Sequence, residues 1–282
     1  MNHEDFQAGQ HTIVLDNLSY LALRVAYTDA GRGEPLLLLH GIPMWSYLYH
    51  DVIGPLSKTY RVLAPDFLGH GYSDRRDCFD RSLCAQRDMI LRFLDALEVD
   101  QVTVVGHDTG GGVALMMGIE HPDRVKRLVL SNVVAYDSWP IDDMIALSNP
   151  MWRDKPASEV AAFVASGLSD GIHNPERLTD EFRAGIVAPY SDEEGKISLI
   201  RNASALNTNH TMALVERHRD ITAPTLVLWG VHDPWQPIAD GERLAEEIPN
   251  ARLVRLENAS HWLQHDAPEA FARNVLAFVD AT

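Results

Sequence analysis

The sequence is poor in cysteine, in basic residues and in long apolar runs, and each shortage excludes a class of protein. Only two of the 282 residues are cysteine, Cys78 and Cys84. Two thiols this close together are expected to remain free, which suits a reducing cytoplasm better than a disulfide-stabilised secreted protein. Lys and Arg number 24 against 40 acidic residues, giving a formal charge of −16. This balance argues against nucleic acids and anionic membranes as partners.

Several targeting segments and binding motifs are also missing. No stretch approaches the roughly 18 apolar residues that span a bilayer. Residues 1–6 carry neither the basic nor the apolar part of a secretory signal, so we expect a cytoplasmic protein. His218 and His232 show no metal-ligand spacing with a cysteine or carboxylate cluster, and the glycines at 110–112 do not form a phosphate-binding motif. We therefore expect neither a metal nor a cofactor.

Short apolar runs alternate with amphipathic segments along most of the chain. The length fits one α/β domain with or without an insertion, and leaves both a monomer and a homodimer open. Strands are expected at 11–15, 21–27, 36–40, 60–65, 102–105, 125–131, 225–229 and 252–256, and helices at 45–56, 82–97, 113–119, 238–247 and 268–279. This alternation predicts an α/β fold, with a mostly parallel eight-stranded sheet and helices on both faces.

The alternation stops between residues 137 and 220. This stretch contains repeated prolines, short helical patterns and no strong strand pattern. We interpret it as a helical cap inserted after the sixth strand. The predicted division is therefore a core domain of residues 1–136 and 221–282, and a cap domain of residues 137–220.

The pentapeptide Gly106-His107-Asp108-Thr109-Gly110 lies between a predicted strand and a predicted helix. It has the spacing of a nucleophile elbow, in which glycines permit a sharp turn and the helix start offers free backbone N–H groups. Asp108 occupies the nucleophile position. Because an ordinary carboxylate is ionised at neutral pH, Asp108 needs no base to prepare it. Its attack on an sp3 carbon gives a hydrolysable ester, which favours epoxides or carbon–halogen bonds as substrates.

Two further candidates each follow a predicted strand. Asp233 comes after the strand at 225–229, and His261 after the strand at 252–256. Active residues of such sheets gather at the carboxyl ends of the strands. The order nucleophile, acid, histidine is the chain order of the α/β-hydrolase triad. We therefore predict Asp108, Asp233 and His261 as the catalytic residues.

The chain resembles the α/β-hydrolase superfamily over nearly its whole length. The Asp elbow, His40-Gly-Ile-Pro43, the loop from Asp66 to Asp74 and Trp229-Gly-Val-His-Asp233-Pro are similar to the epoxide hydrolase and haloalkane dehalogenase branch. The resemblance implies an alkyl ester on Asp108, hydrolysed by water that His261 activates. It also implies an oxyanion hole made by the backbone N–H groups of Ile42 and Thr109. The implied partners are a small apolar organic substrate and water.

At the positions that usually donate a hydrogen bond or proton to the leaving group, this chain differs from both families. Haloalkane dehalogenases usually have Trp after the nucleophile and Asn or Glu in the His-Gly-x-Pro motif, where this chain has Thr109 and Ile42. Epoxide hydrolases usually place a tyrosine near the position of Asn209. The candidates for binding the substrate are therefore Trp45, Tyr136, Tyr190, Asn209 and His210.

Four functions remain open from the sequence. The leading interpretation is an epoxide hydrolase that forms a diol, and the next is a halide-releasing hydrolase with the same mechanism. A third is an ester or lactone hydrolase in which Asp108 acts as a base on water. The fourth is a non-catalytic ligand-binding protein on the same scaffold, although a binding protein has no need of a complete triad.

Overall fold

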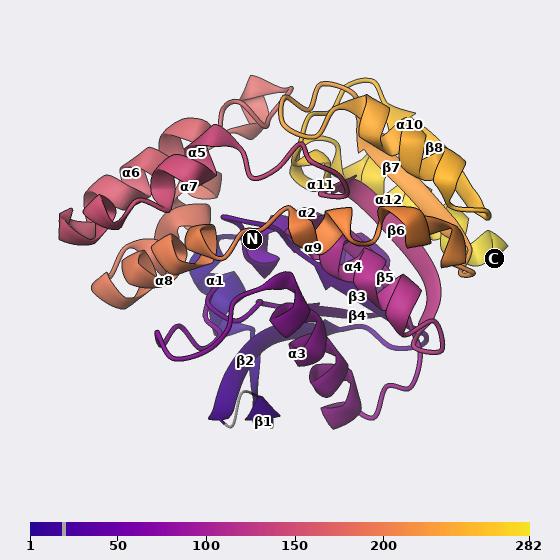
Figure 1. The fold of residues 1–282 in the computed structure, drawn as a ribbon, viewed down its shortest axis with the longest axis horizontal. Helices are drawn as coiled ribbons and strands as arrows, with labels where there is room; N and C mark the ends of the chain where they lie inside the picture. The colour runs from indigo at the N-terminus through magenta and orange to yellow at the C-terminus, as the bar shows by residue number, and fades with distance from the viewer. Residues whose placement is uncertain (19–20) are drawn as a thin grey trace.

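One eight-stranded sheet forms the centre of the molecule (Figure 1). The computed structural model describes residues 1–18 and 21–282. The strand order is β1-β2-β4-β3-β5-β6-β7-β8, in which β1, β2 and β4 pair antiparallel and the other pairs are parallel. The strands are β1 (His11–Leu18), β2 (Leu21–Ala30), β3 (Pro35–Leu39), β4 (Arg61–Pro65), β5 (Val102–Asp108), β6 (Val125–Val133), β7 (Thr225–Gly230) and β8 (Ala251–Leu256).

Alternate residues of the central strands enter two separate apolar cores, one on each face of the sheet. Leu37 of β3 packs on the face covered by α3 (Leu83–Ala96), α4 (Thr109–Glu120) and α10 (Ile238–Glu247). Its neighbour Leu38 packs on the other face, against α2 (His50–Leu56) and α12 (Pro268–Ala281). Successive side chains of a strand point to opposite faces, so strands buried on both sides must be apolar throughout. The predicted fold class is confirmed.

The remaining core elements are short. They are α1 (His3–Ala8), which the sequence did not predict, η1 (Ser46–Tyr49) and α11 (Leu263–Asp266). The predicted helix at 45–56 is thus divided between η1 and α2. Both cysteines are free thiols, as expected. No helix in residues 1–18 and 21–282 is long and apolar enough to cross a membrane.

All elements between β6 and β7 are helical, as predicted. They are α5 (Asp142–Leu147), η2 (Pro150–Asp154), α6 (Ala157–Gly167), η3 (Pro175–Arg177), α7 (Asp180–Val187), η4 (Ala188–Tyr190), α8 (Glu193–Ser204), α9 (Asn209–Met212) and η5 (Val215–Asp220). In Figure 1, α5 to α8 lie together on one side of the molecule, away from α10 and β8. The domain boundaries at 137 and 220 remain a prediction.

A buried arginine ties this insert to the core. Arg81 donates to Ser198 Oγ and Asn202 Oδ1 of α8, both at 2.7 Å. The same two side chains donate to the carbonyl of Gly69 in the core, again at 2.7 Å. Hydrogen bonds to a charged donor stabilise by about 1.5–3 kcal/mol each. The α8 end of the insert is therefore anchored to the loop after β4.

Candidate active site

Asp108 lies at a strained turn between β5 and α4. Its backbone has φ 50° and ψ −122°, a region that residues with a side chain rarely adopt. A Cβ on Gly106 would lie 2.6 Å from the Gly110 carbonyl oxygen, and a Cβ on Gly110 would lie 2.4 Å from the Leu39 carbonyl oxygen. Both positions therefore require glycine, which is the physical reason for the spacing seen in the sequence.

The carboxylate of Asp108 accepts hydrogen bonds from the two backbone groups expected to form an oxyanion hole. Asp108 Oδ2 accepts from the Ile42 N–H at 2.9 Å, and the Thr109 N–H also donates to the carboxylate. A Cβ on Gly41 would lie 2.2 Å from the same oxygen. Glycine at this position thus lets the loop after β3 approach the candidate nucleophile closely.

Burial determines the acidity of Asp108. Its side chain is almost completely enclosed, which raises the pKa to about 6, while His261 and the N–H groups of Ile42 and Thr109 partly oppose this rise. The carboxyl is still mostly ionised at neutral pH. A partly desolvated carboxylate is also a stronger nucleophile than one surrounded by water.

His261 and Asp233 form a buried pair beside this carboxylate. His261 Nδ1 donates to Asp233 Oδ2 at 2.8 Å, so its Nε2 is available as a base. The other oxygen of Asp233 accepts the backbone N–H groups of Trp235 and Gln236 at 2.8 and 3.0 Å. Burial alone would lower the pKa of His261, but the charges of Asp233 and Asp108 outweigh it and raise that pKa.

Asn132 in β6 holds the loop that carries Asp233, and the sequence did not identify Asn132 as a site residue. Its Nδ2 donates to Asp233 Oδ2 at 2.5 Å, and its Oδ1 accepts the Gly230 N–H at 2.8 Å. Asn132 has φ 43°, a conformation that asparagine tolerates better than most residues. No motif marks it, because its partners lie about 100 residues away in the sequence.

His40 and His107 stabilise the surrounding loops. His40 Nδ1 donates to the Gly41 carbonyl at 2.9 Å, and its Nε2 accepts the Phe67 N–H at 3.0 Å. Burial lowers the pKa of His40 to about 4, so the ring is neutral. His107 Nδ1 donates to the Ser131 carbonyl at 2.8 Å, and its ring packs 4.6 Å from that of His261.

A small apolar cavity opens between the sheet and the insert, next to Asp108 and His261. Its volume is about 60 Å³. By the same measure, one water molecule needs about 10–15 Å³. This space suits a substrate of only a few heavy atoms. The walls are mainly the apolar side chains of Ile42, Val134, Met144, Phe163, Val164, Leu168 and Leu206, with Trp139, Trp235, Gln236 and Trp262.

Trp45, Tyr136 and Tyr190, predicted to bind the substrate, do not line this cavity. Trp45 is buried and donates to the Gly185 carbonyl at 2.9 Å. The Tyr136 hydroxyl bonds to Glu247 at 2.8 Å, and Tyr190 is completely buried within the insert. These side chains are used in packing, so the structure does not support them as substrate contacts.

Asn209 and His210 are also absent from the cavity wall. Asn209 is exposed and His210 half-buried. Both lie on the short helix α9, whereas Leu206 of the preceding loop lines the cavity. The segment that contains Leu206, Asn209 and His210 therefore does lie near the cavity, as the sequence predicted. Which of its side chains point into the cavity depends on how the insert folds.

Two polar groups of the cavity residues have no partner in the described part of the chain. They are the indole nitrogen of Trp262 and the side-chain oxygen of Gln236, and both are buried. An unsatisfied buried polar group costs about 1–3 kcal/mol, so a bound molecule that pairs with it gains that amount. Trp262 directly follows His261, and Gln236 comes three residues after Asp233. This closeness in sequence to two of the triad candidates is the one signal that could have identified them.

The comparison with family sequences agrees with this geometry. A model of the alpha/beta hydrolase fold matches residues 34–268. The chain belongs to the α/β-hydrolase family. It is 31% identical over 268 residues to haloalkane dehalogenase 2 of Mycobacterium tuberculosis, covering 90% of each chain. It is also 27% identical to a cis-3-alkyl-4-alkyloxetan-2-one decarboxylase of Shewanella oneidensis, covering 92% of this hydrolase and 86% of the relative.

Two solved structures share this architecture. An α/β-hydrolase fold protein from Burkholderia ambifaria has a TM-score of 0.85 and 28% identity, covering 95% of this hydrolase and 100% of the other chain. The epoxide hydrolase CorEH has a TM-score of 0.82 and 25% identity, covering 96% and 98%. The curated relatives thus favour the dehalogenase alternative over the leading epoxide interpretation, and epoxide hydrolysis is represented by a structural neighbour.

Proposed function

We propose that this hydrolase releases halide from small haloalkanes through an alkyl ester on Asp108. The observation that carries the proposal is a buried, ionisable Asp108 beside the His261–Asp233 pair, facing an apolar cavity with unpartnered polar groups. The 31% identity to a haloalkane dehalogenase supports the same substrate class.

In the first step, the ionised Asp108 attacks the carbon that bears the halogen. A carbon–oxygen bond forms, the carbon–halogen bond breaks, and the halogen leaves with the bonding electrons as halide. The Trp262 indole N–H, which is buried and has no partner in the described residues, is the donor that we assign to this anion. A preorganised donor in a site without water stabilises developing charge by roughly 3–4 kcal/mol.

In the second step, His261 Nε2 takes a proton from water, and the oxygen attacks the carbonyl carbon of the ester. The bond from this carbon to the alkyl oxygen then breaks, the alkoxide takes the proton from His261 and leaves as the alcohol, and the Asp108 carboxylate is restored. The Ile42 and Thr109 N–H groups, which bond to the Asp108 carboxylate, stabilise the oxyanion that forms. Esterification has a further effect. It removes the Asp108 charge, one of the two charges that raise the pKa of His261, so the ring becomes easier to deprotonate when its base function is needed.

The leaving group decides between halide and epoxide. A halide is a very weak base and leaves with hydrogen bonds alone, whereas a ring-opened epoxide oxygen is an alkoxide that needs a proton. Within residues 1–18 and 21–282, no tyrosine lines the cavity, and Tyr136 and Tyr190 lie elsewhere. Apart from the Thr109 hydroxyl, the side-chain donors that line the cavity are N–H groups, which suit a halide.

The test is the intact mass of His261→Gln after exposure to haloalkanes, epoxides and esters of few carbons. The variant cannot activate water for the second step, so the ester should accumulate. An adduct of the substrate without hydrogen halide supports the proposal. An adduct of the whole substrate mass means epoxide opening instead.

A matched control separates catalysis from binding. Asp108→Asn should form no adduct and show no turnover, yet bind the substrate with an affinity near that of the wild type. If the wild type hydrolyses esters and no adduct forms in His261→Gln, Asp108 is a base and the proposal is wrong. If the wild type binds haloalkanes without turnover, the chain is a binding protein on this scaffold.

A further inference from the structure

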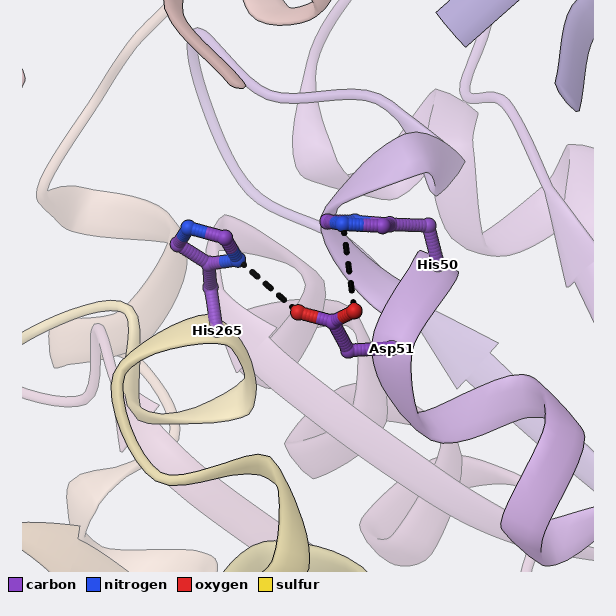
Figure 2. Close-up of side chains that lie close together, drawn as sticks. All are labelled: His50, Asp51 and His265. Atoms are coloured by element: carbon purple, nitrogen blue, oxygen red, sulfur yellow. Dashed lines mark hydrogen bonds and ion pairs between the residues drawn. The ribbon is translucent and has the colours of Figure 1, made fainter. Parts of the chain in front are cut away.

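A cluster of two histidines and one carboxylate lies where α2 and α11 meet the insert, outside the active-site cavity. His50 and Asp51 belong to α2, and His265 belongs to α11 (Figure 2). His50 Nε2 lies 3.3 Å from Asp51 Oδ1, and His265 Nδ1 lies 3.2 Å from Asp51 Oδ2. The two side-chain rings are almost completely buried, and the carboxylate is 29% exposed.

The hydrogen bonds of the two imidazoles fix where their protons are. His50 Nδ1 bonds to the Tyr47 carbonyl at 2.8 Å, and His265 Nε2 bonds to the Arg177 carbonyl at 2.7 Å. A carbonyl oxygen only accepts, so both of these nitrogens carry the proton. In the neutral ring the other nitrogen then presents a lone pair, and in both histidines that lone pair faces Asp51.

Two lone pairs directed at a carboxylate repel it unless a positive charge lies between them. His50 Nε2 lies 3.3 Å and His265 Nδ1 3.2 Å from an oxygen of Asp51. The cluster therefore offers a cation two imidazole nitrogens and one carboxylate that face one another.

We propose that His50, Asp51 and His265 bind a divalent transition-metal ion of the Zn²⁺ class. The three donor atoms lie within 4.8 Å of one another. Each imidazole nitrogen lies near a different oxygen of Asp51, and each separation is close to the edge of roughly 3.3 Å expected for a tetrahedral ion with bonds of about 2.0 Å. Imidazole and carboxylate together suit Zn²⁺ and its neighbours in the first transition row.

The groups around the cluster fit such an ion. Ligating histidines usually donate their second N–H to a carbonyl or carboxylate, which is the arrangement found at both rings. A hollow of about 220 Å³ adjoins the cluster and leaves room for a water ligand. Two further carboxylates, Glu176 and Glu181, line that hollow and favour a cation electrostatically.

Arg177 competes with the ion. Its guanidinium forms a salt bridge with Asp51 Oδ2, so it neutralises the carboxylate when no ion is bound. A bound metal would have to share this oxygen with Arg177 or displace it. This competition predicts opposite effects for two kinds of substitution: removing a ligand weakens metal binding, whereas removing the guanidinium strengthens it.

The proposed site would stabilise the region around the triad without taking part in the reaction. His265 lies four residues after His261, on the helix that follows it, and Asp51 lies on α2. An ion that joins α11 to α2 would hold the His261 loop against the core. This inference is independent of the proposed haloalkane chemistry.

The experiment is a titration of the full chain, dialysed against a chelator, with Co²⁺ followed by its visible absorption, and then competition with Zn²⁺. We expect one ion per chain in the wild type. His265→Gln and His50→Gln should each weaken binding by at least about tenfold. Arg177→Gln should strengthen it. The double variant His173→Gln and His232→Gln is the control, because these exposed rings stack 4.1 Å apart and could chelate adventitiously.

Several outcomes would overturn the proposal. They are no stoichiometric Co²⁺ binding in the wild type, affinity unchanged in His265→Gln, or affinity lost only in the double surface variant. Circular dichroism without metal checks that each variant folds. If the ligand variants do not fold, X-ray absorption of the Co²⁺-loaded wild type decides, because the proposal requires two imidazole ligands, and a spectrum with fewer contradicts it.

Discussion

Replacing the predicted nucleophile should make this protein more stable, and the gain should depend on pH. Asp108 is 5% exposed, and burial raises its pKa from 3.8 to about 6. Each unit of pKa corresponds to about 1.36 kcal/mol, so the ionised carboxylate costs the folded state about 3 kcal/mol. Asn has nearly the same shape, can still accept the Ile42 N–H, and carries no charge.

The sign and the pH window follow from linkage. Because the folded pKa is higher than the unfolded one, folding favours the protonated carboxyl, and the penalty is absent below about pH 4. It grows as pH rises, reaching about 1.6 kcal/mol at pH 5 and its full value above about pH 6 to 7. Asp108→Asn should therefore gain least in acid and most in mild alkali.

Thermal unfolding at pH 5 and pH 8 is the assay. Unfolding entropy of about 2.1 cal/mol/K per residue gives roughly 0.6 kcal/mol/K for this chain of 282 residues. The expected rise in Tm for Asp108→Asn is thus about 3 °C at pH 5 and about 5 °C at pH 8. A rise that is equal at both pH values, or a lower Tm at pH 8, would refute the reasoning that burial of this charge destabilises the fold.

Four further outcomes are expected. Since Asp108 with a pKa of about 6 must be ionised to attack, kcat/KM should fall about tenfold from pH 7 to pH 5; a flat profile contradicts this. Gly41→Ala should lower kcat at least about 100-fold, because its Cβ would lie 2.2 Å from the nucleophile oxygen; unchanged kinetics would mean that the loop yields. Asn132→Ala removes the 2.5 Å bond to Asp233 and should lower kcat about 10- to 100-fold, measured beside a melting curve to separate misfolding. Trp262→Phe removes the unpaired indole donor and should slow halide release about 100-fold, with hydrolysis of a preformed ester in single-turnover experiments left unchanged.

Features that depend on neighbouring residues could be predicted from the sequence. The strands appear as apolar runs because both of their faces are buried, and the elbow appears as glycines because Cβ atoms at Gly106 and Gly110 would collide with the backbone. The positions of Asp233 and His261 after two strands followed from the rule that parallel strands end at one edge. These signals are local, so a single sequence contains them.

The contacts of the triad candidates that the sequence did not reveal are long-range. Asn132 reaches Asp233 across 101 positions, and no periodicity or turn motif records such a pairing. The same holds for His265, which meets Asp51 across 214 positions, so a search for metal-ligand spacing along the chain could not find that cluster.

The sequence by itself therefore determined the fold class, the helical nature of the insert and the three triad candidates, because hydrophobic period and turn chemistry act over a few residues. Only the tertiary structure decided which side chains face the cavity. Tyr190 is completely buried within the insert and Asn209 faces solvent, whereas Gln236 and Trp262 line the site. The physical reason is that the insert's helices are short, and the way they pack on one another and on the core sets the direction of each side chain.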